Sequence, residues 1–123
     1  SKIPDTSVDL ITMFHTLHHI PTKEYVNILK TFHRVLTKDG CIVLYEHNCS
    51  EKNWAGLIDI EHALFDVVVS KKKSYSTYVK NYYSKYLSIA KWESLFKKAG
   101  FNKYFQTEIH NTDNSVYMYY QKA

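Results

Sequence analysis

The chain has 123 residues, of which 45% are apolar and 23% are charged, with three glycines, two prolines and two cysteines. This size and composition indicate one globular domain and exclude a disordered or low-complexity chain. No apolar run approaches the roughly 20 residues that span a bilayer, and the two isolated cysteines favour reduced thiols over a disulfide framework. We therefore expect a single domain over residues 1–123, a cytoplasmic location and no membrane contact.

The net charge of +4 is concentrated in one segment. Residues 70–98 hold eight lysines and one glutamate, whereas residues 1–69 carry more acidic than basic side chains. Tyrosines alternate with these lysines, and nucleic-acid-binding surfaces combine the two types for phosphate contacts and base stacking. The same pattern is also typical of a solvated helix face with its aromatic side chains turned inward. Both interpretations stay open.

The first predicted elements form a strand–helix–strand unit. Residues 8–14, VDLITMF, are short and mostly apolar, as expected of a strand covered on both faces. A helix begins at residues 21–22, and Gly40 ends it, suited to a left-handed cap or a tight turn. Residues 41–45, CIVLY, predict a second buried strand. Two strands joined by a helix are expected to be parallel, with a right-handed crossover.

Polar clusters follow both predicted strands. Residues 15–19, HTLHH, come after the first strand, and residues 46–48, EHN, come after the second. The carboxyl ends of parallel strands lie at one edge of a sheet, where open α/β folds bind their ligands. Connectivity therefore predicts that the two clusters meet at one rim.

The middle of the chain predicts a second helix and a loop. Residues 54–69 suit an amphipathic helix, residues 71–73 a loop, and residues 74–88 are ambiguous, with a short helix as one option. The side chains expected to face inward from the first of these segments are Trp54, Leu57, Ile58, Leu64, Phe65 and Val68.

The end of the chain predicts a helix followed by a hairpin. Residues 89–99 carry apolar side chains at helical spacing, and Gly100 closes this helix. Residues 101–109 and 115–122 alternate as paired strands do, with a turn at residues 111–114.

Three stretches resemble the second half of a class I S-adenosylmethionine-dependent methyltransferase. VDLITMFHTLHHIP resembles the fourth strand and its loop, and FHRVLTKDGCIVLYEHN resembles the next helix end, turn and fifth strand. WESLFKKAGFNKYFQTEIH, with VYMYYQK, resembles the last helix and the reversed final hairpin. The resemblance implies an α/β fold, the C-terminal part of a Rossmann-like seven-stranded sheet.

The sequence departs from that family in its glycines. The family holds its cofactor with a glycine-rich loop after the first strand, and this chain has only Gly40, Gly56 and Gly100, none in a GxGxG pattern. We therefore expect a partial domain whose cofactor loop lies upstream in the same polypeptide. The 123 residues alone are not expected to bind S-adenosylmethionine tightly.

The resemblance implies roles for residues at the predicted rim. Phe14 and His15 would line the methionine side of the cofactor. His18 or His19 would orient the acceptor or act as a base, together with Glu46, because imidazole titrates near neutral pH. The alternative is that the histidines pack against the sheet and shape the loop.

Other side chains are candidates for the acceptor pocket. The residues concerned are Glu46, His47, Asn48, His62, Tyr82 and Tyr83, with residues 60–65 on a helix that would build the pocket wall. Helix capping and packing are the alternatives for these side chains. We expect no bound metal, because HxxHH is not a known ligand spacing and no cysteine pair supports one.

Two classes of function follow. The first is methyl transfer with S-adenosylmethionine, with RNA as the preferred acceptor through residues 71–73, and a small molecule as the alternative. The stretches EHN and DIEHALFD are similar to methyltransferase domains of mRNA capping enzymes in large DNA viruses, which would make the cap guanine the acceptor. The second class is a catalytically inactive methyltransferase-like module that binds a partner.

Overall fold

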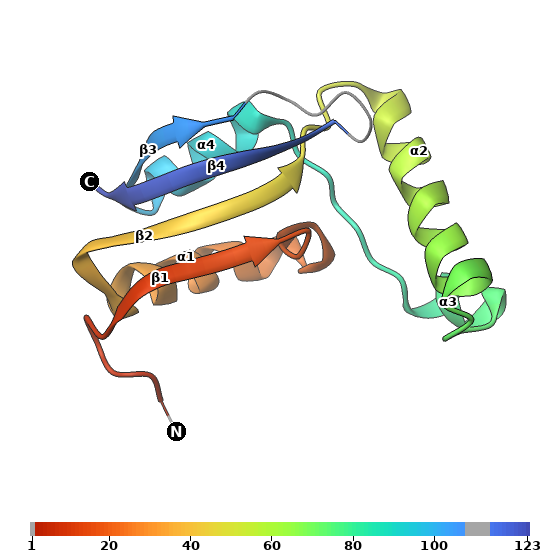
Figure 1. Ribbon diagram of the computed structural model, residues 1–123, viewed down its shortest axis with the longest axis horizontal. Helices are drawn as coiled ribbons and strands as arrows, with labels where there is room; N and C mark the ends of the chain where they lie inside the picture. The colour runs from red at the N-terminus through yellow and green to blue at the C-terminus, as the bar shows by residue number, and fades with distance from the viewer. Residues whose placement is uncertain (1, 108–113) are drawn as a thin grey trace.

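The computed structural model describes residues 2–107 and 114–123, apart from the side chains of residues 52 and 53. Its centre is a four-stranded sheet in the order β1-β2-β4-β3 (Figure 1). β1 pairs with β2 in parallel, and β4 runs antiparallel to both of its neighbours. The predicted parallel unit and the terminal hairpin are confirmed, whereas most of the predicted turn at residues 111–114 lies outside the described residues. The strands are β1 (Val8–Phe14), β2 (Leu36–His47), β3 (Phe101–Gln106) and β4 (Ser115–Lys122).

Two helices cover one face of this sheet. α1 (Tyr25–Val35) and α4 (Ile89–Lys98) both lie behind the sheet in Figure 1. Two short 3₁₀ turns, η1 (Leu17–His19) and η2 (Thr22–Glu24), connect β1 to α1. Burial of apolar surface between these layers is the main stabilising contribution to the fold. The core consists of Leu17, Tyr25, Leu29, Leu36, Ile42, Leu44, Trp92, Phe96, Phe101, Val116, Met118 and Tyr120.

The other face of the sheet is open in the described part of the chain. Leu10 is 53% exposed and Phe14 is 52% exposed, so the prediction of a strand covered on both faces is wrong for β1. The physical reason is visible in Figure 1, where no described helix packs in front of the strands. The apolar residues of β1 therefore form a strand with one face covered by helices and the other face apolar but exposed.

Gly40 has a different role from the one predicted. It lies within β2, where the pairing with β1 shifts between Val8 and Leu10, and its backbone is not left-handed. A Cβ on Gly40 would lie 2.9 Å from Cδ2 of Leu36 and 3.0 Å from the carbonyl oxygen of Val8. The residue is glycine because the strands approach closely. Gly100, with φ of +87°, ends α4 as predicted.

A second group of helices stands at the carboxyl end of β2, away from the sheet (Figure 1). It comprises α2 (Lys52–Ala63), the π-helical turn η3 (Leu64–Val69) and α3 (Tyr75–Asn81). The helix predicted over residues 54–69 and the loop at residues 71–73 are confirmed, and α3 is the short helix of the ambiguous segment. Among the described residues, no helix has the length and apolar character needed to cross a membrane.

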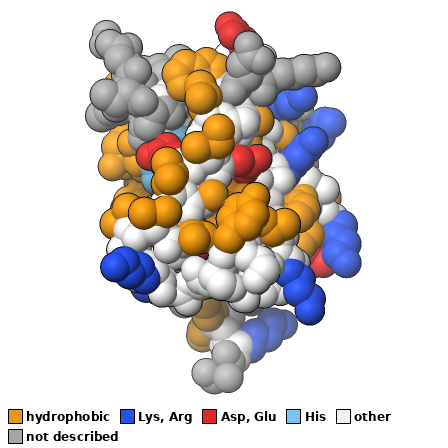
Figure 2. Space-filling model, turned by 90° about the vertical axis from the view of Figure 1, so that its right-hand side faces the viewer, with side chains coloured by type: hydrophobic (Ala, Val, Ile, Leu, Met, Phe, Trp, Pro, Cys, Tyr) orange, Lys and Arg blue, Asp and Glu red, His pale blue; other side chains and the backbone are white. Residues whose placement is uncertain are grey.

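The predicted inward face of this helix is wrong. Ile58 is 2% exposed, but four other apolar side chains predicted to be buried are more than half exposed. α2 and η3 stand clear of the sheet, so these side chains have no described layer to pack against. Figure 2 shows apolar side chains gathered on this side of the molecule. The four exposed side chains are Leu57, Leu64, Phe65 and Val68.

Candidate functional site

Five histidines meet at the carboxyl ends of β1 and β2. His15, His18 and His19 follow β1, His47 ends β2, and His62 comes from α2. The ring centroids of His15 and His47 are 4.3 Å apart, those of His18 and His19 are 4.1 Å apart, and those of His18 and His62 are 5.5 Å apart. The two polar clusters therefore share one rim, as the connectivity predicts.

Glu46 holds the loop after β1 in place. Its carboxylate is buried, and Oε1 accepts hydrogen bonds from the backbone N–H groups of Thr16, at 3.0 Å, and Leu17, at 2.8 Å. Oε2 lies 2.5 Å from Nδ1 of His18. Charge-assisted bonds to one carboxylate tie the loop, the buried imidazole and β2 into one unit.

The hydrogen bonds continue from His18 to His19. Nε2 of His18 lies 3.0 Å from Nε2 of His19, and Nδ1 of His19 lies 3.0 Å from the carbonyl oxygen of Tyr83. A carbonyl only accepts, so Nδ1 of His19 carries a proton. Burial lowers the pKa of His19, with the nearby His18 and His62 adding to the effect. The Nε2 atoms of the two rings thus share one hydrogen bond.

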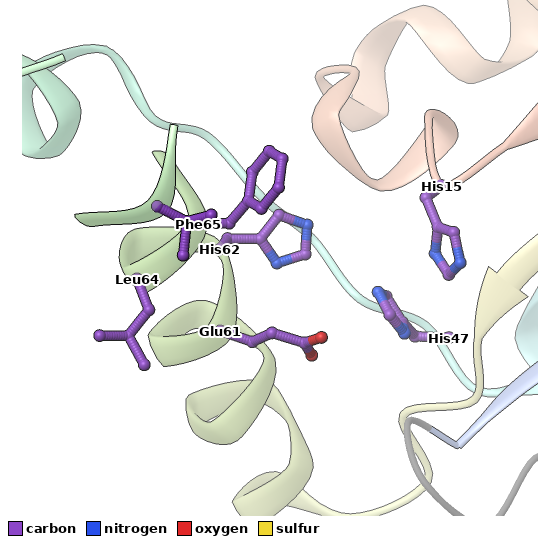
Figure 3. Close-up of a pocket in the computed structure, with 7 residues that line it drawn as sticks. His15, His47, Glu61, His62, Leu64 and Phe65 are labelled. Carbon is purple, nitrogen blue, oxygen red and sulfur yellow. The ribbon is translucent and has the colours of Figure 1, made fainter. Parts of the chain in front are cut away.

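A cavity of about 460 Å³ opens beside this cluster. That volume lies within the range of small-molecule pockets, roughly 300–1,000 Å³. In Figure 3 the side chains of α2 and η3 lie on one side of the cavity and the two histidines from the strand ends lie on the other. The lining residues are His15, His47, Glu61, His62, Leu64, Phe65 and Val69.

Two of the three lining histidines, His15 and His47, are held by contacts with the strands. His15 has φ of +46°, a left-handed conformation that is uncommon for residues other than glycine. Its backbone N–H donates to the backbone carbonyl of Tyr45 at 2.8 Å. Nδ1 of His47 lies 2.9 Å from Oγ of Ser115. The fold thus fixes imidazoles at the cavity wall, where they can bind or take up a proton.

The predicted catalytic residues are mostly enclosed. His18 is fully buried and Glu46 is 1% exposed, so neither reaches the cavity surface, whereas His19 is partly exposed. These residues can position the rim, and their catalytic role stays a prediction. Phe14, predicted to face the cofactor, lies on the open sheet face with its ring edge-on to Tyr45.

The predicted acceptor residues divide into two groups. His47 and His62 line the cavity. Asn48 instead accepts the N–H of Ile89 at 3.1 Å, at the start of α4 and not of the helix that follows it in the chain. Tyr82 and Tyr83 lie outside the cavity lining, and their acceptor role stays a prediction.

Residues 82–86, which include three tyrosines, are held in place by hydrogen bonds that the sequence did not predict. The hydroxyls of Tyr82 and Tyr86 lie 2.7 Å apart, and burial raises the pKa of both. Asp59 of α2 accepts hydrogen bonds from Ser84 at 2.9 Å and from Tyr86 at 2.8 Å. These are contacts that the packing alternative predicts for Tyr82, and its acceptor role stays a prediction. The signal available in the sequence is Asp59 itself, between the apolar residues Ile58 and Ile60.

Residues 60–65 contribute to the cavity as predicted, through Glu61, His62, Leu64 and Phe65. Val69 was not predicted. It reaches the same wall because η3 is wound as a π-helix, in which Ser70 N–H donates to the carbonyl of Phe65 at 2.7 Å. Single π turns occur frequently at functional sites, and the sequence carries no signal for this one.

Comparison with known proteins agrees with the architecture. A family model described as a methyltransferase domain matches residues 1–44. The mitomycin 7-O-methyltransferase structure has a TM-score of 0.67 at 16% identity, over 98% of this chain and 31% of that one. The chain has a methyltransferase fold. No curated protein sequence matches it.

Two further structures share this methyltransferase fold. The Burkholderia thailandensis 1,6-didemethyltoxoflavin-N1-methyltransferase, with 1,6-didemethyltoxoflavin and S-adenosylhomocysteine bound, has a TM-score of 0.67 at 12% identity, over 97% of this chain and 45% of that one. A Methanosarcina mazei S-adenosylmethionine-dependent methyltransferase has a TM-score of 0.66 at 18% identity, over 99% and 62%. The chain therefore spans less than two thirds of the length of each of these structures.

Proposed function

We propose that the protein transfers a methyl group from S-adenosylmethionine to a small-molecule acceptor held in the cavity beside His47 and His62. The observation that carries the proposal is the cavity itself, which lies at the carboxyl ends of two parallel strands in a methyltransferase fold. Folds of this type bind their ligands at that edge. The mitomycin and toxoflavin enzymes named above, whose substrates are small molecules, support the choice of acceptor class.

The chain fits part of a cofactor site. Phe14 and His15, at the end of β1, are the residues we assign to the methionine side of S-adenosylmethionine. No glycine-rich loop occurs in the 123 residues, so we propose that polypeptide upstream of them supplies it. The apolar sheet face around Leu10 and Phe14, open in the described residues, is a surface that such a segment would cover.

In this reaction the chain has two tasks. It positions the acceptor, and it removes one proton from it. Bound S-adenosylmethionine supplies a methyl group on a positively charged sulfur. As the acceptor's oxygen or nitrogen forms its new bond to carbon and the sulfur–carbon bond breaks, the acceptor loses a proton. We assign that proton to His47, which lines the cavity and whose ring is oriented by Ser115 at 2.9 Å. Holding the reactants in line supplies most of the rate.

The test compares His47→Gln with His33→Gln in the full-length polypeptide. His33 lies on α1 against Phe101, outside the cluster, and serves as the control. We expect His47→Gln to reduce the rate of methyl transfer from tritiated S-adenosylmethionine by about 10²- to 10⁴-fold while cofactor binding is retained. A wild-type rate in His47→Gln would remove this histidine from the mechanism.

RNA is the alternative acceptor, with the cap guanine of a viral-type mRNA capping reaction as its specific form. The supporting observation is that residues 71–73 are exposed lysines on a loop, followed by Tyr75, which is 66% exposed. Filter binding of capped RNA over a salt series separates the alternatives. If RNA is the acceptor, neutralising Lys71 and Lys72 lowers the salt slope by about 0.7 per lysine. Absence of RNA retention at low salt would exclude it.

A catalytically inactive binding module is the remaining alternative. It predicts that the full-length polypeptide transfers no methyl group to any acceptor, and that substitution of His47 leaves binding of the partner unchanged. Transfer to a panel of phenols and aromatic nitrogen heterocycles, measured with the tritiated cofactor, distinguishes it from the enzyme.

A further inference from the structure

We propose that His18, His19 and His62 form a binding site for one divalent transition-metal ion of the zinc class. The site is independent of the proposed methyl transfer, because it rests only on the arrangement of the three imidazoles. Neutral imidazole is a preferred ligand of zinc, copper, nickel and iron in proteins.

The three side chains converge from two parts of the chain. One ligand nitrogen from each of His18, His19 and His62 lies within 4.8 Å of the others. Nε2 of His18 and Nε2 of His19 are already 3.0 Å apart. Tetrahedral zinc with bonds of about 2.0–2.1 Å needs ligand nitrogens roughly 3.3 Å apart. The nitrogens therefore need to approach one another by no more than about 1.5 Å to reach that spacing.

Oxygen acceptors orient all three rings in the same sense. Nδ1 lies 2.5 Å from Oε2 of Glu46 in His18, 3.0 Å from the Tyr83 carbonyl in His19, and 2.8 Å from the Ile58 carbonyl in His62. In each ring this leaves Nε2 as the nitrogen for a metal ion. Metal-binding histidines almost always donate their second N–H to a carboxylate or a carbonyl, which fixes the tautomer. The pattern of outer contacts is therefore that of a three-histidine metal site.

A second group, His15, His18 and His47, is also close enough to hold an ion. It shares His18 with the first, so the two groups compete for one ligand. Nδ1 of His47 faces the hydroxyl of Ser115, which both donates and accepts and so does not fix the tautomer. The group with His62 is favoured because its three Nδ1 atoms all face pure acceptors.

The position of His62 gives the ion access to the proposed reaction site. This side chain also lines the cavity, so an ion at His18, His19 and His62 borders the space assigned to the acceptor. A metal ion there would polarise an acceptor oxygen and lower the pKa of its hydroxyl. His62 follows His19 by 43 positions in the sequence, which is why the HxxHH spacing alone predicts no metal.

The experiment uses tag-free full-length protein stripped of metal with a chelator. Co²⁺ is titrated into the protein and followed by visible absorption, and Zn²⁺ then competes for the same site. We expect one equivalent of Co²⁺ with the strong absorption of a tetrahedral nitrogen site, displaced by one equivalent of Zn²⁺. His62→Ala weakens binding by at least about 100-fold, since even outer contacts are worth 10- to 100-fold.

Three controls make the result specific. His33→Gln removes a histidine outside the cluster and leaves the affinity unchanged, and circular dichroism confirms that His62→Ala is folded. His47→Ala retains binding if the ion lies at His62. Absence of Co²⁺ binding, or binding that survives His62→Ala and is lost in His47→Ala, would overturn the assignment.

Discussion

At the scale of single residues, Glu46 connects the fold to the site. One buried carboxylate accepts two backbone N–H groups of the loop after β1 and pairs with the imidazole of His18. Removing one member of a buried pair leaves the other charge or donor without compensation, which is costly in a low-dielectric interior. Glu46 therefore acts mainly by holding the histidine loop in position.

We expect Glu46→Gln to lower the free energy of unfolding by about 1–3 kcal/mol, the range for leaving a buried polar group without its hydrogen-bond partner. Urea denaturation measures the difference. The matched control is Glu93→Gln, which breaks a 2.8 Å ion pair with Lys103 in which the glutamate is 44% exposed. That loss is expected to be below about 1 kcal/mol. Equal effects of the two substitutions would show that Glu46 does not hold the loop.

Ionisation of Tyr25 is expected to lower the stability of the folded protein at alkaline pH. Its ring is buried, its hydroxyl donates to the carbonyl of Leu17 at 3.0 Å, and burial raises its pKa to about 12. An unfolded tyrosine ionises near pH 10, so above that pH the unfolded chain loses its proton first. The stability is intact below pH 10 and falls as the pH rises towards 12.

Urea midpoints measured between pH 8 and pH 11.5 test this expectation. The loss above pH 10 is smaller in Tyr25→Phe, which cannot ionise at that position. It does not vanish, because burial also raises the pKa of Tyr78, Tyr82, Tyr86 and Tyr120. A Tyr25→Phe profile that parallels the wild type above pH 10 would exclude the proposed contribution.

At the scale of elements, two glycines make opposite predictions. A Cβ on Gly40 meets Leu36 at 2.9 Å and Val8 at 3.0 Å, whereas a Cβ on Gly56, within α2, meets nothing within 4 Å. Gly40→Ala should destabilise the protein by about 1–3 kcal/mol through overpacking. Gly56→Ala should stabilise it by up to about 1 kcal/mol, because alanine favours the helix. Thermal unfolding of both variants decides, and destabilisation by Gly56→Ala would contradict the open surroundings of that residue.

The sequence predicts the elements better than it predicts what covers them. The helical spacing before Gly100 and the alternation in the last strands correspond to α4 and the hairpin of β3 and β4. The spacing of apolar residues in β1 and α2 is also typical of buried side chains, although Leu10 and Leu57 are more than half exposed. Periodicity records which face is apolar, and it cannot show whether another layer packs there.

At the scale of the whole molecule, the strand topology predicts where the site lies. It does not predict which side chains from α2 and η3 line the cavity. Two parallel strands put the clusters after β1 and β2 on one rim, and this placement is confirmed by the contacts of His15, His18 and His47. The inward turn of His62 depends on where α2 stands, and the wall formed by Val69 depends on a π turn. The family resemblance, and not local sequence, predicts His62 for the pocket, and the π turn has no signature in the sequence.

The central claim is that S-adenosylmethionine binds at the carboxyl end of β1. Ultraviolet cross-linking of the methyl-tritiated cofactor to the full-length polypeptide, followed by tryptic digestion, tests it without knowledge of the acceptor. Residues 3–23 form one tryptic peptide, between Lys2 and Lys23, and contain Phe14 and His15. We expect label on this peptide that excess S-adenosylhomocysteine prevents. Competed label confined to sequence outside residues 1–123 would contradict the placement of the cofactor.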